Sequence, residues 1–419
     1  MTASSPPAKT FSRYDAFVIT LLAVVQFTVV LDFMVLSPLG AILLEELHIT
    51  TVQFGHVVSA YAFSAGISGL LAASFADKFD RKRLLLVFYG GFIVGTMLCG
   101  LAPNYHLLLI ARIFTGLFGG VMASISFAIV TDLFELERRG RVMGFVGMAF
   151  AASQVLGMPF GLYLANHYGW HMPFFVIVAL SAVVMVVVVL RMRPITGHLA
   201  LQTAENPFRR IGRTLAHPRY LAGFVATTLL ACGGFMLMPF ASTFSVNNLG
   251  ITLEQLPFVY LVTGIGSMCF GPIAGRLSDR IGKFKLFVAG CIIAMSAIAV
   301  YTHLGVSPLW LVITLSVIMF AGITARMVAA QALLSAVPEP RDRGTFMSIN
   351  SSVQQVSGGL AAIVAGLIVV QTPEGPLERY GILGYVVCGI MLTNIVLIAR
   401  IDRLVKADAT QRAPTITTA

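Results

Sequence analysis

Two residues of opposite charge lie inside apolar stretches of this sequence, Asp32 and Arg112, and together they could bind and release a proton. A carboxylate at membrane depth is costly unless it is paired, hydrated or protonated. At a rise of 1.5 Å per residue, Asp32 is expected about 22 Å into its helix, and Arg112 about 10 Å below the opposite face. Both depths correspond to about two-thirds of the way across an apolar layer of about 30 Å. The sequence therefore predicts that Asp32 and Arg112 lie at one depth, where a carboxylate and a guanidinium on neighbouring helices stabilise each other, directly or through water.

Such a pair can couple proton binding to conformation. If a conformational change alters the distance between Asp32 and Arg112, the affinity of the carboxylate for a proton changes with it. The alternative is a static buried ion pair that only fixes helix packing.

The elements that must position this pair are membrane-spanning helices. The chain has 419 residues, of which 57% are hydrophobic and 11% are charged, whereas about a quarter of a soluble domain is charged. A spanning helix needs about 20 apolar residues, and we expect the first run to remain in the membrane as an uncleaved segment. Twelve runs meet this criterion: 16–44, 52–76, 84–102, 106–131, 141–165, 170–192, 219–247, 255–278, 284–304, 307–336, 344–371 and 380–401.

Lysine and arginine are distributed unevenly between the loops. Alternate loops and the two termini carry 25 of the 28 basic residues, and the opposite set of loops carries only Arg379. The positive-inside rule predicts that both termini are cytoplasmic in a multi-pass protein of the plasma (inner) membrane. The net charge of +10 then indicates a surface that faces lipid headgroups of the bilayer, and we expect no nucleic-acid partner.

The chain divides into two halves. The longest polar loop separates six runs from six. The string Asp77–Lys82 recurs at Asp279–Phe284, and Arg139-Gly140 recurs at Arg343-Gly344. Two loops that repeat at nearly one offset indicate a duplication. The predicted fold is all-α, with a bundle over 1–193, a cytoplasmic loop over 194–218, a second bundle over 219–403 and a cytoplasmic tail over 404–419.

The most specific string follows the eighth run and reads Gly275-Arg276-Leu277-Ser278-Asp279-Arg280-Ile281-Gly282-Lys283. We expect its glycines to permit close helix approach and a tight turn, and Asp279 to bind backbone amides of a neighbouring helix end or an arginine. At these residues the chain resembles the major facilitator superfamily. The resemblance implies twelve helices in two pseudo-symmetric six-helix bundles around a cavity, with alternating access. It also implies a gating role for Gly275, Asp279, Arg280, Gly282 and Lys283, and for Asp77, Arg81 and Lys82 in the first copy, where Ala73, Lys78 and Asp80 depart from the pattern.

Two further strings resemble motifs of transporters within this superfamily. Arg112, Gly116 and Gly120 look like the pattern of proton-coupled members, which implies a role for Arg112 in proton transfer. Gly157, Pro159 and Gly161 are similar to the antiporter motif of drug efflux members, and the residues that follow look like the arabinose-efflux-like branch. A proline kink with small residues for helix packing is the alternative for this second string.

Polar and aromatic residues within the runs are candidates for the substrate cavity, although packing in the core or against lipid is the alternative for each aromatic and methionine. Arg326 could contact an anionic or polyhydroxyl substrate or a gate carboxylate, or extend toward headgroups instead. The candidates are Gln26, Phe33, Tyr61, Gln154, Phe235, Met238, Arg326, Asn350 and Gln354.

The sequence contains no phosphate-binding loop, no nucleophile elbow and no histidine–carboxylate metal cluster, so we expect neither an enzyme nor a cofactor or metal site. The leading hypothesis is a monomeric secondary transporter that exports small organic molecules, drug-like or sugar-like, in exchange for protons. One alternative is a proton symporter or uniporter for uptake of sugars, organic anions or nucleosides. Another is a non-transporting sensor or lipid-handling membrane protein.

Overall fold

The computed structural model describes residues 12–197, 199, 207–339 and 342–412. Twelve of its helical segments are long and apolar enough to cross a membrane, which confirms the predicted number. Most of their ends differ from the predicted ends by only a few residues. The spans are 13–35, 51–72, 81–100, 105–133, 138–168, 172–191, 218–247, 256–281, 283–301, 309–334, 343–368 and 380–407.

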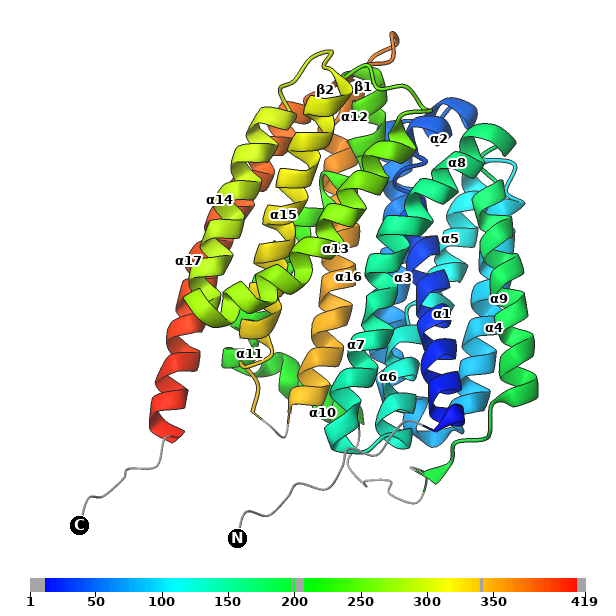
Figure 1. The fold of residues 1–419 in the computed structure, drawn as a ribbon, viewed down its shortest axis with the longest axis vertical. Helices are drawn as coiled ribbons and strands as arrows, with labels where there is room; N and C mark the ends of the chain where they lie inside the picture. Colours follow the sequence, from blue (N-terminus) through cyan, green and yellow to red (C-terminus); the bar gives the residue numbers. More distant parts are fainter. Residues whose placement is uncertain (1–11, 198, 200–206, 340–341, 413–419) are drawn as a thin grey trace.

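The helices form two bundles that lie side by side (Figure 1). The N-half (residues 13–191) contains α1 (Arg13–Val35), α2 (Gly40–Glu46), α3 (Thr51–Phe75), α4 (Arg81–Gly100), α5 (Tyr105–Gly119), α6 (Met122–Leu133), α7 (Leu136–Ala152), α8 (Met158–Tyr168) and α9 (Met172–Arg191). The C-half (residues 218–412) contains α11 (Pro218–Phe235), α12 (Ala241–Asn247), α13 (Leu256–Ile281), α14 (Lys283–Tyr301), α15 (Leu309–Leu334), α16 (Arg343–Ile368) and α17 (Tyr380–Arg412).

Local sequence explains where several helices begin. Ser12 and Thr50 each form a capping box, with Asp15 and Gln53 respectively. The Asn104 side chain accepts a hydrogen bond from the amide of Leu107 at the start of α5. These side chains satisfy amides that have no partner within the helix.

Four of the twelve predicted runs are interrupted, at glycine or proline. The first predicted run breaks at Pro38 between α1 and α2, and the fourth breaks at Gly120 between α5 and α6. The fifth contains a π-helical turn, Ser153–Gly157, directly before Pro159. The seventh breaks in a 3₁₀ turn at Met238–Phe240, which contains Pro239. Proline removes a backbone donor and clashes with the preceding turn, which accounts for the breaks at Pro38, Pro159 and Pro239.

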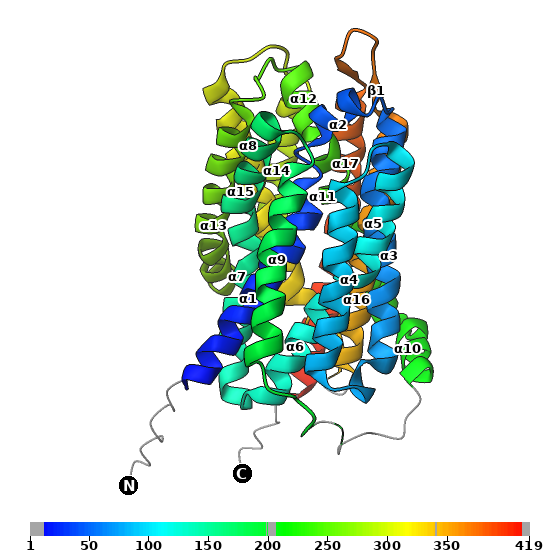
Figure 2. The same ribbon diagram turned by 90° about the vertical axis from the view of Figure 1, so that its right-hand side faces the viewer.

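The ends of the molecule differ in charge. The helix ends that meet at the connections after α3, α6 and α13 are rich in arginine and lysine, and we call that end of the bundles the basic end. The hairpin of β1 (Val370–Gln371) and β2 (Leu377–Glu378) lies at the other end, the hairpin end, together with α2 and α12 (Figures 1 and 2). The start of α1 and the end of α17 both lie at the basic end.

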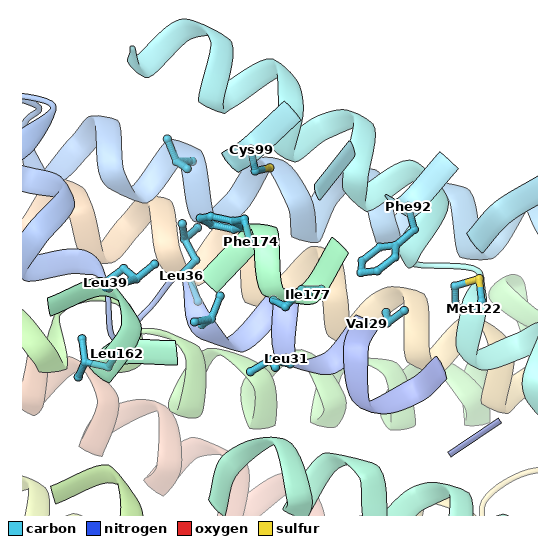
Figure 3. Close-up of a cluster of buried hydrophobic side chains, with 14 of the residues drawn as sticks. Val29, Leu31, Leu36, Leu39, Phe92, Cys99, Met122, Leu162, Phe174 and Ile177 are labelled. Atoms are coloured by element: carbon cyan, nitrogen blue, oxygen red, sulfur yellow. The ribbon is translucent and has the colours of Figure 1, made fainter. Parts of the chain in front are cut away.

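Each half has an apolar interior. In the N-half, Val29 and Leu31 of α1 lie among Phe92 and Cys99 of α4 and Ile177 of α9 (Figure 3). A second cluster fills the C-half near the basic end, where Phe224 of α11 stacks on Phe346 of α16. The first cluster continues into the C-half, where it includes Phe240, Val259 and Ile298, so the two bundles share part of their core.

Two predictions about the polar segments need correction. The loop predicted over 194–218 contains a helix, α10 (Pro207–Ala216), which packs against α16 and α11 of the C-half and α3 of the N-half; residues 198 and 200–206 of that loop lie outside the described part. The predicted tail over 404–419 begins inside a helix, because α17 continues to Arg412, and residues 413–419 are not described.

Candidate transport site

Asp32 and Arg112 form a buried ion pair in the centre of the N-half. The Arg112 Nη1 lies 2.8 Å from Asp32 Oδ2, and the two side chains are 1% and 0% exposed. The other carboxylate oxygen, Oδ1, accepts a hydrogen bond of 3.2 Å from the Thr96 hydroxyl of α4. The predicted contact between the two charges is confirmed, and each compensates the other where solvent is excluded.

Tyr61 covers the guanidinium. Its ring centroid lies 4.5 Å from the Arg112 Cζ, a distance at which a cation is attracted to an aromatic face. Tyr61 of α3 also lines the cavity between the halves. One aromatic ring therefore contacts both the ion pair and the cavity.

The cavity has a volume of about 210 Å³ and is lined by both halves. Gln26, Phe33 and Tyr61 contribute from the N-half, and Phe235 and Gln354 from the C-half, so these five predicted cavity residues lie where they were expected. Phe33 is central, with ring centroids 5.3 Å from Tyr61 and 5.9 Å from Phe235. A cavity lined by three aromatic side chains, with the amides of Gln26 and Gln354 beside them, suits a small organic molecule.

Gln26 is held in place by a partner on another helix. Its Nε2 donates a hydrogen bond of 2.9 Å to the Ser126 hydroxyl of α6. The amide oxygen is left available to accept a hydrogen bond.

Four predicted cavity residues do not line this cavity. Gln154 lies in the π-helical turn, where its backbone packs against Gly264 of α13. The Met238 carbonyl accepts a hydrogen bond from the Ser37 hydroxyl at the hairpin end. Asn350 faces α11 and accepts a hydrogen bond of 2.5 Å from Thr227.

The fourth residue, Arg326, is 0% exposed inside the C-half. The alternative in which it extends toward headgroups is therefore wrong for this conformation.

The sequence reasoning missed a polar face on α16. Its serines Ser348, Ser351 and Ser352 line the cavity together with Gln354 and Gln355. Spacings of three and four residues place side chains on one side of a helix, and this period was the available signal. Ser124 of α6 was missed as well, because a lone serine in an apolar run carries no such pattern.

The first copy of the loop motif is bound within the N-half. Arg81 pairs with Asp132 of α6 at 2.8 Å, and Lys82 Nζ donates to the carbonyls of Val189 and Met192 at the end of α9. The cation at the carbonyl end of a helix is favourable. The side chain of Asp77 lies outside the described part. These contacts tie α4 to α6 and α9.

The second copy of the loop motif makes fewer polar contacts than the first among the described residues. Gly282 joins α13 to α14 with φ +95°, a conformation that favours glycine, so the predicted tight turn is confirmed. Asp279 and Arg280 are exposed, as is Lys283. Among the described residues Asp279 has neither a hydrogen bond nor an ion pair, so the contact predicted for it is wrong in this conformation. A Cβ at Gly275 would have no neighbour within 4 Å, so close helix approach does not occur there.

The predicted packing glycines do bring helices together. Gly116 and Gly120 meet Tyr61 and Ala65 of α3 so closely that a side chain would overlap the α3 backbone, while Gly157 and Gly161 contact Leu31 and Val35 of α1. Pro159 is buried at the start of α8. The spacing of these motifs therefore sets the approach of α5 to α3 and of α8 to α1. Their roles in proton transfer and antiport remain predictions.

Comparison with known proteins places this arrangement in a family. The model of the Major Facilitator Superfamily matches residues 22–362 and, in a second match, 223–415. The chain belongs to the major facilitator superfamily. Its relatives include the uncharacterised MFS-type transporter YceJ of Bacillus subtilis (strain 168), which is 28% identical over 93% of this chain and 97% of its own length. Multidrug resistance protein 2 of the same organism is 23% identical, over 65% of this chain and 69% of its own.

Solved structures share the fold. A bacterial homologue of the human lysosomal transporter Spinster, in an inward-facing form, has a TM-score of 0.71 at 17% identity, over 94% of this chain and 97% of its own. The nucleoside transporter NupG has a TM-score of 0.71 at 12% identity, over 92% and 99%. The two-bundle major facilitator fold predicted from the sequence is thereby confirmed.

The two halves of this superfamily member are joined at the hairpin end. Ser242 donates a hydrogen bond of 3.0 Å to the Ser37 carbonyl, and Thr51 donates one of 2.7 Å to the Val369 carbonyl. Asn166 also bonds to the Leu253 carbonyl. Near the middle of α7 and of α13, by contrast, a Cβ at Gly144 or at Gly271 would meet no atom within 4 Å. The described contacts thus close the hairpin end of the cavity.

Proposed function

We propose that this chain is a proton-coupled secondary transporter that exports small organic molecules by alternating access. It acts as a monomer in the plasma (inner) membrane, with both termini cytoplasmic. Asp32 carries the proton, Arg112 sets its affinity, and the cavity around Phe33, Tyr61 and Phe235 holds the substrate.

The observation that carries this proposal is the isolated Asp32–Arg112 pair behind Tyr61. Protonation of Asp32 removes the attraction to Arg112, so a proton and the arginine compete for one carboxylate. A movement of Tyr61 on substrate binding would change the position of the Arg112 guanidinium that it covers, and with it the attraction between Arg112 and Asp32. Proton affinity and substrate occupancy are then linked, and this linkage is reciprocal.

The direction of transport rests on a weaker observation. Two relatives are named multidrug resistance proteins 2 and 3, and the latter is 32% identical over 31% of this chain and 25% of its own length. Export of drug-like molecules in the manner of the drug:proton antiporter branch follows by analogy. Uptake of nucleosides, sugars or organic anions is the second candidate, since a nucleoside transporter shares the fold. A sensor without transport would leave a costly buried ion pair unused, which counts against it.

Flux in proteoliposomes tests the proposal. Vesicles are loaded with ethidium, radiolabelled arabinose or uridine, and a pH gradient is imposed in either direction. We expect gradient-driven movement opposite to the proton flux, lost in Asp32→Asn while substrate binding is retained. Asp402→Asn is the matched control, because that carboxylate lies on α17 and pairs with Lys406. Movement along with the protons would favour uptake, and an unchanged proton dependence in Asp32→Asn would refute the coupling role.

A further inference from the structure

Arg326 of α15 is a buried cation without a counter-charge. Its side chain is 0% exposed, and its Nε and Nη1 have no hydrogen-bond partner in the described part of the chain. The remaining nitrogen, Nη2, reaches the Leu230 carbonyl only at 3.4 Å. Arg112 of the N-half, in contrast, has Asp32 at 2.8 Å.

The sequence offers no acidic residue to neutralise Arg326. The spanning helices of the C-half contain three acidic residues, Asp279, Asp402 and Asp408, all near the basic end. Asp279 is exposed, and Asp402 pairs with Lys406 at 2.6 Å. A guanidinium buried without an anion is far less stable than one in water, so this position is costly for a purely structural side chain.

Arg326 packs on the backbone of α11, a helix that contributes a side chain to the cavity. A Cβ at Gly233 of α11 would lie 3.2 Å from Nη1, and one at Gly234 would lie 3.6 Å from Nη2. Because these two positions carry no side chain, the guanidinium packs directly on the α11 backbone. The next residue, Phe235, lines the cavity.

A second unsatisfied polar group lies in the same half. Asn394 of α17 is 0% exposed, and neither atom of its amide has a hydrogen-bond partner among the described residues. It follows by three positions Met391, which contacts the same Gly233 as Arg326 does. Its amide could donate to an anion held by the guanidinium.

We propose that Arg326 binds the acidic group of the transported molecule, so that the substrate class is small aromatic organic acids with a carboxylate. The guanidinium presents a planar pair of donors that match a carboxylate. Glycine at 233 and 234 and the break at Pro239 allow α11 to bend, and this movement opens Arg326 to the cavity. The aromatic part of the molecule then contacts Phe33, Tyr61 and Phe235. This inference rests on the proposed transport function and narrows its substrate.

Thermal unfolding of the purified full-length protein in detergent tests the site without a proton gradient. The probes are benzoate, salicylate and 2-naphthoate, each compared with its neutral amide, and potassium chloride alone. We expect at least one carboxylate to raise the Tm saturably while its amide does not. In Arg326→Gln the half-saturating concentration should rise at least tenfold, which corresponds to about 1.4 kcal/mol. Arg326→Lys, which keeps the charge but loses the planar pair of donors, should give an intermediate shift.

Arg403→Gln is the matched control, since that arginine is exposed on α17, and it should bind as the wild type does. Absence of a shift from all three carboxylates, equal shifts from acids and amides, or retention of the shift in Arg326→Gln would each overturn the assignment. A shift from chloride without one from the carboxylates would assign Arg326 to a resident inorganic anion and overturn it as well. The comparison of acid with amide uses the wild type only, so it holds even if Arg326→Gln does not fold.

The two proposals fail separately. Asp32→Asn should retain a saturable carboxylate shift because Arg326 is unchanged, although the reciprocal linkage alters its half-saturating concentration. In the wild type, absence of gradient-driven flux with an intact shift would refute proton coupling and leave the anion site, whereas coupled flux with no shift would refute the anion site alone.

Discussion

The strength of the Asp32–Arg112 pair can be measured by a double-mutant cycle. The variants are Asp32→Asn, Arg112→Gln and the combination of both. At 2.8 Å and an effective dielectric constant of about 20, the Coulomb attraction is about 6 kcal/mol, and desolvation of both ions opposes most of it. Each single substitution leaves one buried charge uncompensated, and we expect each to lower the free energy of unfolding by about 3–5 kcal/mol.

The double variant should be less harmful than the sum of the singles. It removes both charges together, so no ion remains buried alone. We expect a coupling energy of about 2–3 kcal/mol, which is at the upper end for residues in contact. The Asp15–Arg138 pair of the same half is the control. Its charges are 3.7 Å apart and its side chains are 27% and 21% exposed, so its cycle should give about 0–1 kcal/mol.

Tryptophan fluorescence during unfolding by denaturant in mixed micelles provides the assay. Trp170 is buried beside Phe174 at the start of α9, whereas Trp310 of the C-half is 66% exposed. A Trp310→Phe background therefore makes the signal specific for the N-half. Additive effects of Asp32→Asn and Arg112→Gln, or a coupling energy no larger than that of the control pair, would refute the view that the two charges stabilise each other.

Two other predictions concern packing and the closed hairpin end. Gly120→Ala should lower the free energy of unfolding by about 1–3 kcal/mol, because the new methyl group overlaps the Ala65 backbone. In the control Gly144→Ala the methyl group meets no atom within 4 Å, so the free energy of unfolding should stay unchanged or rise by up to about 1 kcal/mol. Equal effects of the two variants on thermal unfolding would contradict this role of Gly120. Thr51→Val removes a buried hydrogen bond to the Val369 carbonyl that contributes about 1 kcal/mol, so we expect roughly fivefold more of the conformation that opens at the hairpin end. Spin labels on Glu46→Cys and Glu254→Cys in a cysteine-free background should report the longer distance in Thr51→Val. The control Thr314→Val, which removes a hydroxyl that bonds within its own helix, should leave the distance unchanged. An unaltered distance distribution in Thr51→Val would count against the role of Thr51.

Depth in the membrane could be predicted from the sequence, while rotation about a helix axis could not. The rise per residue is constant, so counting positions from the helix ends was enough to place Asp32 and Arg112 at one depth, whereas the proximity of their two helices followed from the resemblance to the superfamily. Which side of a helix faces the cavity depends on the neighbouring helices. In helices that are apolar on all sides, hydropathy does not mark that side. Asn350 therefore turned out to face α11, whereas the next residue, Ser351, lines the cavity.

Helix breaks could be predicted from the sequence, while the short helix α10 could not. Pro159 and Pro239 marked their breaks because proline acts locally. The helix α10 was missed, since its ten residues lie between prolines and carry several arginines, a composition that also fits a polar loop. Contacts with α16, α11 and α3 stabilise it, and such tertiary contacts leave no periodic signal in a segment so short.

The bonds that close the hairpin end, from Ser37, Thr51, Ser242 and Asn166 to backbone carbonyls, join neutral partners. Screening by dissolved ions weakens charge–charge attraction and leaves neutral dipoles almost untouched. The strength of this closure should therefore change little with the salt concentration of the medium, unlike that of a closure made of ion pairs.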